Sequence, residues 1–92
     1  MSVLTPERVQ ESLRSLPQWK LVGEEIVRQY KFADFKAAMV FVNQVAEKAE
    51  AAGHHPDIDI RYNQVKLALV SHDQGGLTEQ DMKMAKVFDS LS

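Results

Sequence analysis

The sequence contains no cysteine among its 92 residues. A disulfide framework and a metal site built on thiolates are therefore both excluded. The sequence also lacks an excess of positive charge, because its formal net charge is -2 at pH 7. Its lysines and arginines are scattered, whereas a protein that binds nucleic acid directly normally carries a basic patch or stripe. Direct binding of DNA or RNA is therefore disfavoured.

Long hydrophobic runs are absent as well. No stretch approaches the roughly 20 apolar residues of a membrane-spanning helix, and the N-terminus has no charged segment followed by an apolar run. We therefore expect a cytoplasmic protein with no membrane segment. With 45% hydrophobic residues, the chain is large enough for one core and too small for two. This predicts a single domain over residues 1–92.

The first third of the sequence predicts a helix followed by a hairpin. Thr5 is a suitable N-cap for the helix, and Pro17 is expected to end it. Residues 19–22 and 26–32 then have the composition of two strands, with a turn near Gly23-Glu24.

The middle of the sequence changes to a helical period. Apolar residues between Asp34 and Ala52 follow the spacing of a long amphipathic helix, and Gly53 is a suitable stop. The expected buried stripe consists of Phe35, Ala38, Met39, Val42, Val45, Ala46 and Ala49. At about 100° per residue, Glu50 is also expected on this buried stripe. A carboxylate on a buried face requires a structural or functional explanation.

A second hairpin is expected after this helix. Ile58, Ile60 and Tyr62 alternate with charged residues, and Asn63-Gln64 is expected to be the turn before another alternating run. Directly opposed side chains on such strands lie close together. The predicted pairs are Tyr62 with Val65, Ile60 with Leu67, Ile58 with Leu69 and, by extension, His55 with His72.

The end of the sequence predicts a third helix, running to about Leu91. Thr78 and Asp81 have the spacing of a capping box at its start. Its expected buried face consists of Ala85, Phe88 and Leu91, with Met84 at the edge. The predicted order of helix, two strands, helix, two strands, helix indicates an α+β fold, in which three helices pack on one face of a four-stranded antiparallel sheet.

Two adjacent histidines follow the long helix, and they are the main candidates for chemistry. Glu50 lies just before His54 and His55, and the remaining histidine, His72, is expected one hairpin away. Histidine can donate or accept a proton near neutral pH, so such a cluster favours an enzyme that uses acid/base catalysis. Ser71 beside His72 does not match a nucleophile elbow, and the glycine pair at 75–76 does not match a phosphate-binding loop.

Structural roles for the same residues remain open at this point. The histidine pair could belong to an ordinary helix cap or loop, and Asp81 could serve only as the capping-box acid. Trp19 and Tyr62 could be core or rim aromatics. A zinc site is disfavoured, because adjacent histidines on extended chain point to opposite sides.

The spacing of these residues resembles that of the pterin-4a-carbinolamine dehydratases. The family motif runs from a glutamate through three residues to His-His-Pro, then to an aromatic residue, a histidine and an aspartate. In this sequence these positions are filled by Glu50, His54-His55-Pro56, Tyr62, His72 and Asp81. Trp19-Lys20-Leu21 is also similar, so the resemblance covers nearly the whole chain. One departure is Ile58, where some relatives carry a tryptophan.

The resemblance implies dehydration of a 4a-hydroxytetrahydropterin to the quinonoid dihydropterin. This step recycles the pterin after aromatic amino acid hydroxylation, which makes a hydroxylase of that pathway a candidate partner. The family uses no metal, and the pterin is the substrate rather than a cofactor. The resemblance implies His54 and His72 as the acid/base pair and His55 as the group that orients the substrate or stabilises charge. Substrate contacts are expected from Glu50, Asp81, Trp19 and Tyr62, the last two in place of the missing tryptophan.

The family also has roles that do not depend on turnover. Members have the α+β fold described above and associate as homodimers or homotetramers by joining sheet edges and helices. Some act as a dimerisation cofactor for a transcription factor. The resemblance therefore implies two further hypotheses, a non-catalytic binding module of this kind and an accessory protein that binds pterin.

Overall fold

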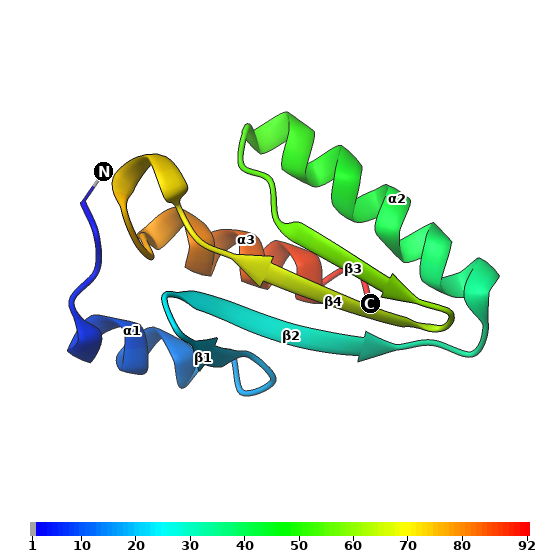
Figure 1. Ribbon diagram of the computed structural model, residues 1–92, viewed down its shortest axis with the longest axis horizontal. Coiled ribbons are helices and arrows are strands. Elements are labelled where there is room, and N and C mark those ends of the chain that lie inside the picture. The colour runs from blue at the N-terminus through cyan, green and yellow to red at the C-terminus, as the bar shows by residue number, and fades with distance from the viewer. Residues whose placement is uncertain (1) are drawn as a thin grey trace.

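Three helices and four strands follow one another in the order that the sequence predicts (Figure 1). The computed structural model describes residues 2–92. The elements are α1 (Pro6–Leu13), β1 (Lys20–Val22), β2 (Glu25–Lys31), α2 (Phe35–Ala52), β3 (Asp57–Arg61), β4 (Gln64–Leu69), a short 3-10 helix η1 (His72–Gln74) and α3 (Glu79–Asp89). The predicted α+β fold is confirmed. No helix within residues 2–92 is long and apolar enough to cross a membrane.

The four strands form one antiparallel sheet in the order β1-β2-β4-β3. Because β4 runs antiparallel to both of its neighbours, its last residues lie between the first residues of β2 and the first residues of β3. Segments that are far apart in the sequence therefore meet at this end of the sheet. They are the β1–β2 turn, the α2–β3 connection and the loop that follows β4 (Figure 1).

The predicted register of the second hairpin is wrong by two residues. Ile60 pairs with Val65 and Ile58 with Leu67, and the turn consists of Tyr62 and Asn63. Tyr62 adopts the left-handed conformation that such a turn requires, with φ 54. Gln64 is then the first residue of β4, and it pairs with Lys31 and Arg61.

Contacts outside the hairpin help to hold this turn. The Asn63 side chain donates to the Phe32 carbonyl oxygen at 2.9 Å, and the Phe32 N–H donates to the Asn63 carbonyl oxygen at 2.8 Å. Because the β3–β4 pairing begins at Asp57 and Ala68, the predicted pairing of His55 with His72 is also wrong.

Helix α2 begins and ends at the residues that the sequence indicates. Asp34 caps its start by accepting from the Ala37 N–H at 2.8 Å, and Gly53 ends it in the left-handed conformation with φ 65. The prediction that Glu50 is buried is wrong, because its side chain is 82% exposed. The buried face is narrower than expected and lies one residue away from Glu50, which leaves Phe35 and Ala46 exposed as well. It consists of Ala38, Phe41, Val42, Val45 and Ala49.

Helices α1 and α3 are both shorter than expected. Helix α1 ends at Leu13, and bonds between residues three apart continue the chain to Leu16. Helix α3 ends at Asp89 and buries Ala85 and Phe88 as predicted. Met84, which the periodicity places at the edge, is only 4% exposed, whereas Leu91 is only partly buried. Met84 belongs to the same core cluster as side chains of α2 and the sheet, whereas Leu91 lies beyond the end of α3.

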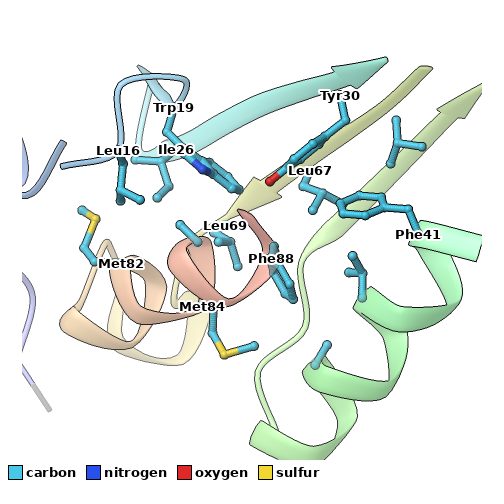
Figure 2. Close-up of a cluster of buried hydrophobic side chains, with 14 of the residues drawn as sticks. Leu16, Trp19, Ile26, Tyr30, Phe41, Leu67, Leu69, Met82, Met84 and Phe88 are labelled. Carbon is cyan, nitrogen blue, oxygen red and sulfur yellow. The ribbon is translucent and has the colours of Figure 1, made fainter. Parts of the chain in front are cut away.

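The core lies between the sheet and the helices, and Trp19, Tyr30, Phe41 and Phe88 contribute aromatic rings to it (Figure 2). Tyr30 packs against Phe41 with ring centroids 4.6 Å apart and edge-on against Trp19 at 6.4 Å. One carboxylate oxygen of Asp89, at the end of α3, accepts from Trp19 Nε1 at 3.0 Å, from Arg28 at 2.7 Å and from the Tyr30 hydroxyl at 2.6 Å. These bonds attach the end of α3 to β2 and to the segment before β1.

Tyr30 gives the fold a distinct response to alkaline pH. Burial raises the pKa of Tyr30 far above its usual range, and the hydrogen bond to Asp89 adds to this effect. The unfolded chain ionises this group near pH 10, so the folded state binds more protons above that pH. Its contribution to stability is therefore fully present below about pH 10 and is lost as the pH rises further. In Tyr30→Phe we expect a shallower fall in the free energy of unfolding above pH 10, measured by urea denaturation.

The other tyrosine is the control for this prediction. Tyr62 is 66% exposed, so Tyr62→Phe should leave the pH dependence as it is in the wild type. Equal slopes above pH 10 for the wild type and Tyr30→Phe would contradict the assignment.

Candidate active site

The three histidines line one cleft at the end of the sheet where β4 finishes. His54 and His55 lie in the connection between α2 and β3, and His72 is the first residue of η1. In Figure 1 these are the green connection above the sheet and the yellow loop beside it. The cleft has a volume of about 390 Å³, and Ser71, Asp73 and Gln80 also contribute to its walls. The strand order therefore brings the histidines together although the predicted pairing of His55 with His72 is wrong.

The ring of His54 is held in place by a buried carboxylate. Its side chain is only 11% exposed, and its Nε2 lies 2.5 Å from Oδ1 of Asp81, which is completely buried. The other oxygen of Asp81 accepts from the Thr78 N–H at 2.9 Å and from the Ser71 hydroxyl at 2.8 Å. Asp81 thus satisfies the start of α3 and fixes the imidazole at the same time.

The bond to Asp81 also sets how His54 meets the cleft. A carboxylate can only accept hydrogen bonds, so Nε2 of His54 carries the hydrogen in this contact. The other ring nitrogen, Nδ1, is then the atom that remains for proton exchange with a ligand. Asp81, expected to bind substrate, is completely buried and contacts His54, and the capping-box role weighed for it is confirmed.

His55 has a carboxylate partner too, but this pair is exposed. Nε2 of His55 lies 2.7 Å from Oε1 of Glu50, and the two side chains are 62% and 82% exposed. Glu50 lies in the last turn of α2, one turn before the histidines. Exposed pairs of this kind contribute little to stability. Both groups are therefore free to bind a ligand at little cost to the fold.

His72 differs from the other two histidines because its ring has no hydrogen-bond partner within residues 2–92. Backbone bonds shape the loop that carries it. The Ser71 N–H donates to the Gly76 carbonyl oxygen at 3.1 Å, and Gly75 takes the left-handed conformation with φ 82. This closes a tight loop that presents His72 to solvent.

The two aromatic residues expected at the site lie elsewhere. Trp19 is 3% exposed and packs in the core, so its ring has no free face for a ligand. Tyr62 is exposed at the β3–β4 turn, seven residues beyond His55 on an extended segment, which corresponds to about 20 Å. Within one copy of the chain, neither ring lies with the histidines.

The sequence patterns did not indicate the roles of two residues that support the site. Ser71 donates to Asp81 and contacts the Thr78 hydroxyl at 2.9 Å, and it is buried. Gln80 lines the cleft and donates to the Ala52 carbonyl oxygen at 3.4 Å. No local pattern indicates either role, because both depend on contacts between separate segments. Within residues 2–92 there is no group of three His, Asp or Glu side chains placed to hold a metal ion.

Comparison with known proteins shows which family the sequence is similar to. The model of the family described as pterin 4 alpha carbinolamine dehydratase matches residues 2–91. A protein of Acidobacterium capsulatum, provisionally named a pterin-4-alpha-carbinolamine dehydratase, is 63% identical over 99% of both chains. A protein of Chloroflexus aurantiacus with the same provisional name is 53% identical over 99% of this chain and 98% of its own.

Solved structures also resemble this fold. A protein from Brucella melitensis, described as a transcriptional coactivator/pterin dehydratase, superposes with a TM-score of 0.94 at 39% identity over 98% of both chains. A pterin dehydratase-like protein described as a RuBisCO assembly factor in the alpha-carboxysome has a TM-score of 0.70 at 22% identity, over 80% of this chain and 88% of its own, and shares the fold. The family model and the relatives cover almost all of the sequence, and the chain therefore belongs to the pterin 4 alpha carbinolamine dehydratase family.

Proposed function

We propose that this protein catalyses the dehydration of a 4a-hydroxytetrahydropterin to the quinonoid dihydropterin and water. The main support is the gathering of all three histidines around one cleft. Two of these histidines have a carboxylate at hydrogen-bond distance, Asp81 for His54 and Glu50 for His55. Family membership supplies the substrate class. The reaction needs no other cofactor, since the pterin itself is the substrate.

The reaction requires two proton transfers at neighbouring positions of the pterin ring. A base removes the proton from the ring nitrogen next to the carbinol carbon, and the released electron pair forms the C=N bond. The C–O bond breaks in the same process, and an acid protonates the departing hydroxyl so that it leaves as water. Paired proton transfer of this kind suits imidazoles, which titrate near neutral pH.

We assign His54 and His72 as the acid/base pair. The ring of His54 is held by its bond to Asp81, whereas the ring of His72 has no hydrogen-bond partner among residues 2–92. They come from different segments and line the same cleft, which suits groups that act on two positions of one ligand. His55 then orients the substrate or stabilises charge, and Glu50 binds the polar edge of the pterin.

We also propose that the protein acts as a homodimer or homotetramer. Strands β1 and β3 are both edges of the sheet, so each has a side without a strand partner in a single chain. Ile58 and Ile60 on β3 are each 37% exposed. Pairing of edges between copies would satisfy these backbone groups and cover the apolar side chains.

The decay of a freshly generated 4a-hydroxytetrahydropterin, followed by ultraviolet absorbance, tests the proposal. We expect the wild-type protein to accelerate the decay over the uncatalysed rate. A variant with His54, His55 and His72 all changed to alanine should show no acceleration. Lys36→Ala, an exposed change near the start of α2, should behave as the wild type. Absence of acceleration by folded wild-type protein would overturn the proposal.

A second candidate function is a non-catalytic binding module that dimerises a transcription regulator. It is supported by the Brucella melitensis relative, which is described as a transcriptional coactivator as well as a pterin dehydratase. The triple histidine variant separates the two functions, because a binding module should keep its effect on the partner without the histidines. An accessory protein that only carries pterin would bind the ligand without turnover.

A further inference from the structure

The segment before α1 packs against the loop that carries His72. In Figure 1 this N-terminal segment, residues 2–5, is the blue stretch next to the yellow loop. The Leu4 N–H donates to the Leu77 carbonyl oxygen at 2.8 Å, and the Leu4 side chain packs against the core. These contacts hold the neighbouring residue, Val3, against Gly76.

The contact with Val3 explains why position 76 is a glycine. A Cβ atom at this position would lie 2.9 Å from Cγ1 of Val3 and 3.6 Å from Cγ2. Gly76 does not have the left-handed conformation that Gly75 adopts, so its backbone does not require a glycine. The close packing of Val3 therefore excludes a side chain at Gly76.

Gly76 is connected to the acid/base site through Ser71. The Ser71 N–H donates to the Gly76 carbonyl oxygen at 3.1 Å, and the Gly76 N–H donates to the Ser71 carbonyl oxygen at 3.2 Å. Ser71 directly precedes His72, and its hydroxyl donates to Asp81, the carboxylate that holds His54. The position of Ser71 therefore affects both His54 and His72.

From these contacts we infer that Val3 is a positioning residue for the acid/base pair, and that it acts by holding the Gly76–Ser71 bridge in place. The inference rests on the proposed function, in which His54 and His72 transfer the protons. Turnover then depends on a side chain that does not line the histidine cleft. The effect on the rate can be large, because a displacement of about 1 Å can cost roughly 10²-fold.

Three variants test this role by moving a methyl group from one side of the contact to the other. Val3→Ala removes the two methyl groups that touch Gly76 and should lower kcat about fivefold, with little change in KM. Gly76→Ala places a Cβ too close to Val3 and should lower kcat by about tenfold. In Val3→Ala/Gly76→Ala the new methyl group lies 3.9 Å from Cβ of residue 3, an ordinary contact. We expect this double variant to recover kcat to within about twofold of the wild type.

The rates are compared at a temperature where circular dichroism shows that every variant is folded. A residue that contributes only to stability would leave kcat unchanged under this condition. A fall in kcat without a change in KM, followed by recovery in the double variant, therefore indicates positioning of the reacting groups.

Hydrogen exchange of the Ser71 and Gly76 amides, measured by NMR, gives a readout that does not depend on turnover. Both N–H groups donate within the bridge, so they exchange with solvent when the loop opens. Val3→Ala should speed their exchange about fivefold, as the loss of two half-exposed methyl groups from the contact would produce. The double variant should restore the slow exchange.

Val40→Ala is the matched control, because it makes the same change on α2, outside the histidine cleft, at a valine that is 54% exposed against 46% for Val3. It should keep the wild-type kcat and exchange rates. A wild-type kcat in Val3→Ala, or no recovery in the double variant, overturns the positioning role while turnover by the wild type still supports the enzyme. Absence of turnover by folded wild-type protein overturns the proposed function instead. Faster exchange in Val3→Ala then still supports the role of Val3 in holding the loop, and unchanged exchange overturns it.

Discussion

Replacing His54 with alanine is expected to slow the dehydration by about 10²–10⁴-fold, the usual contribution of a positioned acid or base. His54 is the histidine whose ring is most firmly held, because it is 11% exposed and bonded to a buried carboxylate. A fixed ring keeps its proton-transferring nitrogen in place before the substrate arrives. The measurement is the rate of absorbance decay at saturating substrate, compared with the wild type.

A structural role for His54 has to be distinguished from this chemical role, since its loss leaves Asp81 without one of its partners. Free imidazole should restore part of the turnover to His54→Ala if the lost group is an acid or base, because it can enter the vacated space. Imidazole would not repair a misfolded site. Lys36→Ala, at an exposed position outside the cleft, is the control and should keep the wild-type rate with or without imidazole. A folded His54→Ala protein with a nearly wild-type rate would contradict the assignment.

Replacing Asp81 with alanine is expected to lower the free energy of unfolding by about 3 kcal/mol, because several buried donors lose their acceptor together. Asp81 is completely buried and accepts from the Thr78 backbone, the Ser71 hydroxyl and His54. For a domain of this size, such a loss lowers the melting temperature by roughly 15 °C. The measurement is thermal denaturation followed by circular dichroism.

Glu79→Ala is the matched control for Asp81, since it removes another carboxylate from the first turn of α3. Glu79 is exposed, so its loss should change the stability by less than about 1 kcal/mol. An equal effect of the two substitutions would show that Asp81 contributes only its charge near the helix start.

Asp81→Asn tests the positioning role of Asp81. An asparagine has one acceptor oxygen where aspartate has two. If that oxygen accepts from the start of α3, the NH2 group faces His54 and can only donate, which forces Nε2 of His54 to accept. We expect a smaller loss of stability than in the alanine variant but a clear fall in the maximal rate, with little change in KM. Normal turnover by Asp81→Asn would show that His54 does not need its carboxylate.

The sequence by itself determined where the three helices start and where α2 ends, because helix caps depend on residues within a few positions of one another. Thr5, Gly53 and the Thr78–Asp81 capping box have the roles that their spacing predicts. The alternation of apolar residues likewise predicts the two hairpins and therefore the fold class. Glu50, His54 and His55 could be recognised as candidates together because one helix exit carries all three.

Other features depended on contacts between distant segments. The observed register of β3 and β4 differs by two residues from the predicted register. Asn63, in the observed turn, bonds to Phe32, which lies outside the hairpin. Trp19 is buried in the core and cannot contact a ligand. Its indole N–H donates to Asp89 at the end of the last helix.

The candidate site also combines features that local sequence predicts with features that depend on distant contacts. Its histidines are visible in the sequence, but the link between His54 and Asp81 joins residues 27 positions apart. The cleft that brings His72 to His54 and His55 also needs the loop after β4 to lie beside the α2–β3 connection. Only the tertiary structure decided these two features. The packing of separate elements determines which side chains meet, and the spacing of residues along the sequence does not predict that packing.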